Sequence, residues 1–263
     1  MQTEHPKIKI AVHKFSSCDG CQLGFLNSVN EVLKLSQWIE ILHFAEAGPC
    51  DPEAKVDIAF VEGSIATPDD GERIRLIREN SGFLVSIGAC ATSGGIQALR
   101  NMADHDEWLS AVYARPEFIH SLATSTPIAE HVKVDYELWG CPINGKQLLH
   151  CIQTWLLGGM PETEYDSVCT ECKRQHNSCV VVTQQRPCLG PVTRAGCGAI
   201  CPSLDRDCYG CFGPASLCNT ESLAKQFASM QVSNVDIANR FLQINSHSKE
   251  FHSIGIEYRK SDE

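Results

Sequence analysis

The sequence predicts an α/β fold, a doubly wound parallel sheet followed by a cysteine-rich, irregular domain. Three observations predict it. Short apolar runs alternate with stretches of helical period as far as about residue 159, the composition changes after Pro161, and nine of the fifteen cysteines lie between Cys169 and Cys218. Repeated strand–helix units are typical of a parallel sheet covered by helices on both faces. We therefore expect a first domain over residues 1–161 and a second over residues 162–263.

Five apolar runs are the expected strands. Each has the length and composition of a buried strand. They span residues 8–12, 39–44, 56–61, 83–87 and 132–138. The carboxyl ends of parallel strands meet at one edge of the sheet, where ligands bind, so the residues that follow these runs are the first candidates for a site.

Helices are expected between the strands. Residues 24–35 repeat apolar side chains close to the helical period. Residues 73–80 follow a pair of acidic residues, as the start of a helix favours, with Gly82 as the expected C-cap. Asn144 is the expected N-cap of a further helix, which Gly158 and the glycine and proline after it would end.

Four cysteines of the first domain follow expected strands. Cys18 and Cys21 form a C-x-x-C pair after the first run, Cys90 follows the fourth, and Cys141 follows the fifth. Four thiolates at one sheet edge would hold zinc or an iron–sulfur cluster. Taken alone, this spacing leaves zinc and iron equally open.

The second domain holds a denser set of cysteines. Eight of them are enough for two four-thiolate sites: Cys169, Cys172, Cys179, Cys188, Cys197, Cys201, Cys208 and Cys211. Cys218 is left over. A simple zinc ribbon has two C-x-x-C pairs and one spacer, whereas three four-cysteine sites in one chain indicate a row of redox centres. The segment has few large apolar residues, so we expect metal to supply its order, with a helix over 234–244 capped by Ser233 after it.

Composition restricts the partners and the compartment. The formal net charge of −10 argues against nucleic acid and against an anionic membrane surface as partner. The N-terminal residues have no apolar signal core, and no run reaches the length of a transmembrane helix. We therefore expect a cytoplasmic protein without a membrane partner, whose cysteines bind metal and do not form disulfides.

Three further residues have both a structural and a functional interpretation. Cys50 and Cys151 lie outside the motifs and are expected to be structural thiols. Glu62 ends a strand, where it is expected either to accept backbone hydrogen bonds from a loop or to tune a cluster or a proton path. No other side chain is assigned a catalytic role in this chain.

In combination, the motifs carry a resemblance. Ser17-Cys18-Asp19-Gly20-Cys21, Val61-Glu62-Gly63-Ser64, Gly140-Cys141-Pro142 and the cysteine pattern from Pro187 to Cys211 resemble the small subunit of nickel–iron hydrogenases. The chain is most similar to the delta type of the cytoplasmic, NAD(P)-linked enzymes and sulfhydrogenases. The resemblance implies a flavodoxin-like domain and an electron-transfer role, with hydrogen activated in a separate large subunit.

The resemblance also implies a set of cofactors. A proximal 4Fe-4S cluster would be held by Cys18, Cys21, Cys90 and Cys141, a distal one by Cys169, Cys172, Cys179 and Cys188, and a medial one by Cys197, Cys201, Cys208 and Cys211. The large subunit would hold the nickel–iron centre, and a flavin NAD(P)H-oxidoreductase with FAD and further iron–sulfur subunits would complete the complex. The partition of Cys179 to Cys201 between the outer clusters and the role of Cys218 stay open.

Two other functions remain as alternatives. The first is the small subunit of a hydrogenase linked to coenzyme F420 or to a heterodisulfide reductase, which only the partner subunits distinguish. The second, from another class, is a zinc-stabilised interaction scaffold, which the identity of the metal distinguishes. The related quinone-linked respiratory subunit fits less well, because it has no cysteine-rich tail of this kind.

Overall fold

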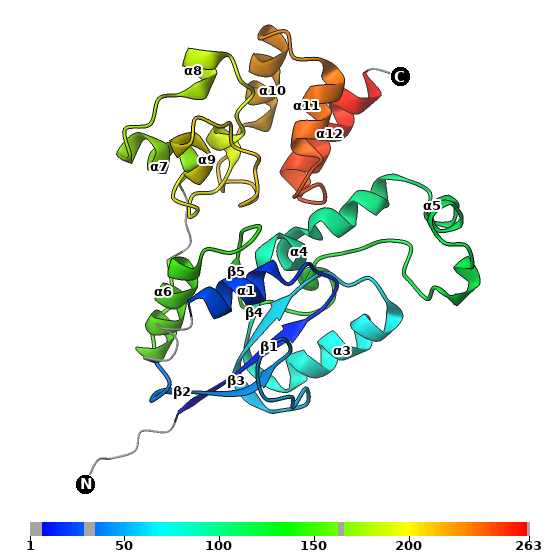
Figure 1. The fold of residues 1–263 in the computed structure, drawn as a ribbon, viewed down its shortest axis with the longest axis vertical. Helices are drawn as coiled ribbons and strands as arrows, with labels where there is room; N and C mark the ends of the chain where they lie inside the picture. The colour runs from blue at the N-terminus through cyan, green and yellow to red at the C-terminus, as the bar shows by residue number, and fades with distance from the viewer. Residues whose placement is uncertain (1–6, 29–34, 163–165, 262–263) are drawn as a thin grey trace. The chain divides into compact units, whose positions relative to one another are not determined.

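The computed structural model describes residues 7–28, 35–162 and 166–261, and the chain divides into two compact units (Figure 1). Unit 1 is Met1–Pro161 and unit 2 is Glu162–Glu263. Among the described residues, no helix has the length and apolar character needed to cross a membrane.

Unit 1 is built on a parallel sheet. Its five strands are β1 (Ile8–Lys14), β2 (Ile39–Phe44), β3 (Val56–Glu62), β4 (Ser81–Ile87) and β5 (Tyr136–Leu138). They lie in the order β2-β1-β3-β4-β5, and every pairing is parallel. This is the order of flavodoxin-like folds, so the predicted fold class is confirmed.

Helices cover both faces of this sheet (Figure 1). Because side chains alternate along a strand, Ile10 and Val12 pack in the cluster that holds residues of α1 (Gly20–Asn27) and α6 (Gly145–Leu156). Ala11 packs in a second cluster with residues of α3 (Pro68–Glu79). The remaining elements of unit 1 are α4 (Gly88–Ser93), η1 (Gly95–Met102), α5 (His105–Val112), η2 (Pro116–Phe118) and η3 (Ile128–Glu130).

Most predicted elements of unit 1 are present, with different ends. α1 begins at Gly20, earlier than predicted, and part of the predicted helix over 24–35 lies outside the described residues. Gly82 was wrong as a C-cap: α3 ends at Glu79 with Asn80 as its C-cap, and Gly82 lies inside β4. The chain enters the strand directly after the helix, so no left-handed glycine is needed there.

The last strand is shorter than its apolar run. The Asp135 amide donates to the Leu84 carbonyl at 2.9 Å, but the Asp135 side chain takes the backbone donor of Leu84 that a strand carbonyl would otherwise bind. Asp135 accepts a hydrogen bond from the Leu84 amide at 2.9 Å through its carboxylate, and Arg78 donates to the same carboxylate oxygen at 2.5 Å. Residues 132–135 therefore precede β5 as irregular chain. The predicted cap of α6 is confirmed, since the Asn144 side chain accepts from the amide of Lys146.

Unit 2 contains short helices in the cysteine-rich segment and longer ones after it. They are α7 (Val168–Arg174), α8 (Val180–Gln184), η4 (Gly190–Val192), α9 (Ile200–Ser203), α10 (Thr220–Ser229), α11 (Asn234–Phe241) and α12 (Lys249–Lys260). Ser233 caps α11 as predicted, although the helix ends three residues before Ile244.

This unit also has its own apolar core. Phe227, Phe241 and Phe251, one from each of α10 to α12, are almost fully buried and share a cluster with Leu189 and Val192 of the cysteine-rich segment. The composition of the cysteine-rich segment predicts that metal alone supplies its order. The structure differs, because the three helices supply an apolar surface against which the segment packs.

Candidate metal centres

The first group of cysteines lies at the carboxyl edge of the sheet. Cys18 and Cys21 follow β1, Glu62 ends the neighbouring strand β3, and Cys90 lies on α4 directly after β4. Cys141 comes three residues after the end of β5, and its peptide bond to Pro142 is cis. The strand order changes direction between β1 and β3, where open α/β sheets bind their ligands.

Two glycines leave room for the sulfur atoms of this group. Gly88 has φ +84°, and a Cβ atom there would lie 2.3 Å from the Cys21 Sγ. Gly95 has φ +60°, and a Cβ atom there would lie 2.6 Å from the Cys90 Sγ. Only glycine combines this backbone conformation with such close approach, so both positions form a cradle around thiols.

The four thiols interact with one another electrostatically. Burial raises the pKa of Cys90 to about 12, and negative charge on Cys141 and Cys18 would raise it further. Burial is also the main cause that raises the pKa of Cys21, followed by the charges of Glu62 and then of Cys90 and Cys141. Cys21 and Cys90 are therefore neutral when free, and a metal must displace their protons to bind.

Glu62 holds the start of α1. Its side chain is 2% exposed, and its two carboxylate oxygens accept hydrogen bonds from the amides of Cys21 at 3.0 Å and Gln22 at 3.2 Å. The residue before the helix, Asp19, supplies no side-chain cap. The structural interpretation of Glu62 is thereby confirmed: a carboxylate on β3 satisfies amides in the first turn of a helix that carries Cys21.

A second group of thiols lies in unit 2. Burial raises the pKa of Cys169 to about 11, and the charges of Cys188, Cys172 and Cys179 would raise it further. Gly190 packs beside two of these thiols, since a Cβ atom there would lie 3.4 Å from the Cys188 Sγ and 3.5 Å from the Cys169 Sγ. Cys169 and Cys188 thus lie close together, with Cys172 and Cys179 as charged neighbours of Cys169.

Four further cysteines of unit 2 form two pairs, Cys197 with Cys201 and Cys208 with Cys211. The pKa of Cys197 is raised by burial first, then by Glu171, and to a smaller extent by Cys201. Burial also raises the pKa of Cys208, with Cys188 and Cys211 as charged neighbours. The amide of Cys208 donates to the Cys188 Sγ at 3.2 Å, so one cysteine of the assigned medial set contacts one of the assigned distal set. Within the described parts of the chain, no three His, Cys, Asp or Glu side chains are grouped closely enough to hold a single metal ion.

Three cysteines lie outside these groups. Cys151 is 3% exposed and packs in the core of unit 1, as expected for a structural thiol. Cys50 is exposed, so its thiol is not a core residue. Cys218 packs against the apolar core formed by α10 to α12.

Glu171 was missed by sequence reasoning. It lies inside the C-x-x-C pair of α7, and its carboxylate accepts hydrogen bonds from amides on both sides of Cys197. An acidic residue between two cysteines gives no sign of such a contact, because its hydrogen-bond partners lie 25 to 28 residues further along the chain.

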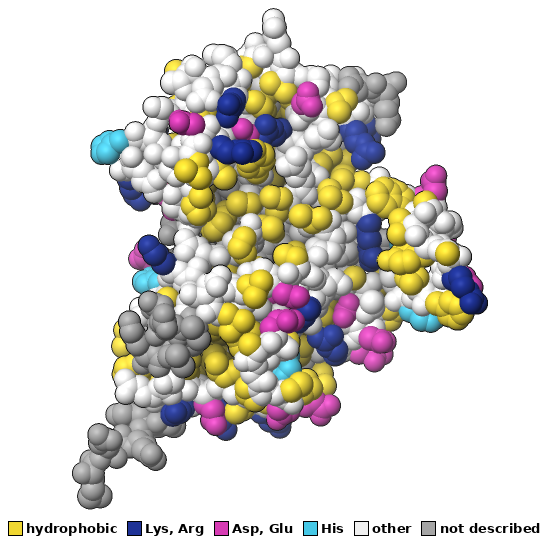
Figure 2. Space-filling view, viewed as in Figure 1, with side chains coloured by type: hydrophobic (Ala, Val, Ile, Leu, Met, Phe, Trp, Pro, Cys, Tyr) yellow, Lys and Arg dark blue, Asp and Glu magenta, His cyan; other side chains and the backbone are white. Residues whose placement is uncertain are grey.

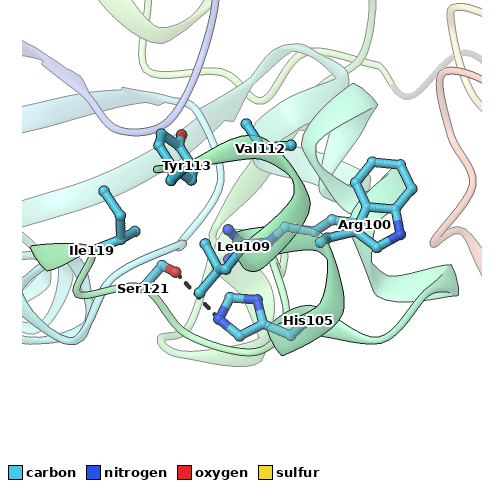
Figure 3. A pocket seen from close by; sticks show the side chains of 8 residues that line it. Arg100, His105, Leu109, Val112, Tyr113, Ile119 and Ser121 are labelled. Carbon is cyan, nitrogen blue, oxygen red and sulfur yellow. Dashed lines mark hydrogen bonds between the residues drawn. The ribbon is translucent and has the colours of Figure 1, made fainter. Parts of the chain in front are cut away.

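A pocket of about 270 Å³ lies beside α5 in unit 1 (Figure 3). Arg100, His105 and Ser121 contribute its polar groups, and His105 Nε2 lies 3.4 Å from the Ser121 Oγ. Its apolar walls come from Trp108, Leu109, Val112, Tyr113 and Ile119. No cysteine lines it, so the pocket is separate from the thiol groups.

Apolar side chains gather on the surface of the same segment (Figure 2). The large ones that are at least 45% exposed are Ile96, Trp108, Val112, Tyr113 and Phe118. An exposed apolar patch of this kind is typical of a protein–protein contact surface.

A flavodoxin-like sheet with thiols at its ligand-binding edge, joined to a unit with nine more cysteines, is typical of iron–sulfur electron-transfer proteins. The comparisons with known proteins agree. The family model described as "NADH ubiquinone oxidoreductase, 20 Kd subunit" matches residues 18–155. The delta subunit of sulfhydrogenase 2 from Pyrococcus furiosus is 33% identical over 208 residues, which are 79% of this chain and 87% of that protein.

Two further comparisons cover different shares of the chain. A subunit of the F420-non-reducing hydrogenase vhu from Methanocaldococcus jannaschii is 32% identical over 235 residues, covering 78% of this chain and 82% of that protein. A chain of the crystal structure of an NAD+-reducing nickel–iron hydrogenase in the H2-reduced state has a TM-score of 0.57 and 29% identity, covering 61% of this chain and 97% of that one. The chain belongs to the family of nickel–iron hydrogenase small subunits. It is an electron-transfer subunit of a multisubunit hydrogenase that also has a large subunit.

Proposed function

We propose that this chain holds three 4Fe-4S clusters and relays electrons between the nickel–iron site of the large subunit and a flavin NAD(P)H-oxidoreductase partner. The observation that carries the proposal is the close approach of the Cys21 and Cys90 thiols to Gly88 and Gly95 at the sheet edge, with Cys18 and Cys141 as neighbours of Cys90. The proposed ligands are Cys18, Cys21, Cys90 and Cys141 for the proximal cluster, Cys169, Cys172, Cys179 and Cys188 for the distal one, and Cys197, Cys201, Cys208 and Cys211 for the medial one.

The donor set fits iron–sulfur clusters. Every proposed ligand is a thiol, and backbone amides already donate to two sulfur atoms: Cys208 to the Cys188 Sγ, and Gly210 to the Cys208 Sγ at 3.5 Å. Bound clusters would supply one-electron redox chemistry. The residues of the chain fix the clusters through thiolates, exclude water by burial, and set the potentials through hydrogen bonds to sulfur. Family membership favours this function over the zinc-stabilised scaffold.

The electron acceptor proposed is NAD(P). It is supported by the likeness to the NAD+-reducing hydrogenase, of which this chain covers nearly the whole matched subunit. A second candidate is a hydrogenase linked to another acceptor, such as F420 or a heterodisulfide reductase. Within this candidate, the likeness to the F420-non-reducing enzyme supports an acceptor other than F420. The proposed location is the cytoplasm, where soluble thiols keep cysteines reduced and available for metal.

Two measurements on the complex purified anaerobically with its natural partners test the proposal. Iron, acid-labile sulfide, zinc and nickel are measured on the complex and on the partner subunits prepared without this chain, and the two should differ by about 12 irons, as three four-iron clusters require. Assays with hydrogen and either NAD+, NADP+ or F420 then identify the acceptor. Stoichiometric zinc without iron would overturn the cluster assignment, and reduction of F420 alone would overturn the assigned acceptor.

A further inference from the structure

Glu171 binds the loop around Cys197 with both carboxylate oxygens. The loop amides that donate to it are those of Gly196 at 3.0 Å, Gly198 at 3.1 Å and Ala199 at 3.3 Å. The Cys197 Sγ itself lies 3.8 Å from the same carboxylate. One side chain of α7, the helix that carries Cys169 and Cys172, thus satisfies three backbone hydrogen-bond donors around a thiol that is distant in the sequence.

The backbone of this loop explains why a carboxylate fits. Gly196, Gly198 and Ala199 have φ values of +125°, +70° and +48°. When successive residues include left-handed ones, their amide groups point toward a common centre. Such backbone forms a concavity that binds an anion. Here the Glu171 carboxylate is the anion. It stabilises a left-handed conformation that is unfavourable for Ala199, the one non-glycine residue among these three.

We propose that Glu171 is a positioning residue: it fixes the loop that presents Cys197 and places a negative charge beside the cluster held there. The inference rests on the proposed function, because it requires Cys197 to be a cluster ligand. Reduction adds one electron and no proton to that cluster, so a fixed negative charge close to its ligand sulfur disfavours reduction. The carboxylate therefore lowers the potential of this cluster relative to one without such a neighbour.

Two substitutions separate the role of the charge from that of the contacts. Glu171→Gln keeps one acceptor oxygen and removes the charge, whereas Glu171→Ala removes all the contacts. Glu221→Gln is the matched control, because Glu221 lies in the same unit on α10 with 66% of its side chain exposed and pairs at the surface with Lys225. Iron content and redox titration by EPR are measured on the anaerobically purified complex.

Glu171→Gln is expected to favour reduction of one cluster by at least tenfold, which is about 59 mV for a one-electron couple. Glu171→Ala is expected to lose about four irons per chain, the content of one cluster. Glu221→Gln should change neither. Loss of iron from Glu171→Gln would also support the positioning role. A wild-type chain without iron would overturn the proposed function, whereas wild-type iron content with unchanged potentials and iron in both Glu171 variants would overturn this inference alone.

Discussion

Replacement of Gly88 by alanine tests whether the cradle at the sheet edge is built for a cluster. Gly88 has φ +84°, and a left-handed alanine is less stable than glycine by about 1–2 kcal/mol. In addition, the new Cβ would lie 2.3 Å from the Cys21 Sγ. Cβ atoms essentially never lie closer than 3.0 Å to such a neighbour, so the thiol must move. We expect Gly88→Ala to lower the iron content by about four atoms per chain, one cluster, as well as the stability.

Two other glycines separate these effects by the same substitution. Gly158 has φ +75° but nothing within 4 Å of its Cβ position, so Gly158→Ala should destabilise by about 1 kcal/mol with iron unchanged. Gly71 lies within α3, also with open space, and Gly71→Ala should stabilise by about 0.5–1 kcal/mol. Iron analysis and chemical unfolding of all three variants are the assays. Wild-type iron content in Gly88→Ala would refute the cradle argument.

Three further predictions concern unit 1. Cys141→Ser should remove about four irons and abolish hydrogen-linked reduction of the acceptor, while the exposed Cys50→Ser changes neither; an active Cys141→Ser with full iron would contradict the ligand assignment. Glu62→Ala leaves the amides of α1 unpaired, and urea unfolding should show a loss of about 1–3 kcal/mol, in contrast to no loss if the carboxylate were only a surface group. Burial is the main cause that lowers the pKa of His13 from 6.5 to about 3, so the unfolded state binds the proton more readily. The free energy of unfolding should therefore fall by about 1.4 kcal/mol per pH unit as the pH drops from 6.5 toward 3. Between pH 7 and pH 5, chemical unfolding should show a smaller decrease of this free energy in His13→Phe than in the wild type.

The position of the first thiol group could be predicted because it depends on topology alone. Any parallel sheet brings the carboxyl ends of its strands to one edge, so the order of Cys18, Cys90 and Cys141 after apolar runs was sufficient. The ends of the elements could not be predicted in the same way. β5 is short because the Asp135 side chain takes a backbone donor of β4, and α3 ends at Glu79 because the next strand starts at once. Both depend on contacts between segments distant in the sequence or on how the chain continues.

Glu62 and Glu171 show where sequence reasoning stops. In each unit, the carboxylate of one element binds backbone amides at or beside a cysteine of a distant segment. In both cases, cysteine spacing identifies the thiol but not the carboxylate that orders the backbone around it. Glu62 could be selected because it ends a strand at the edge where the thiols meet. Glu171 could not, because the concavity it fills is created by left-handed residues that include Ala199, and an alanine gives no sign of a positive φ. The ligands of such sites can therefore be predicted from residue types in the sequence. The carboxylates that position these ligands cannot, because their contacts depend on backbone conformation.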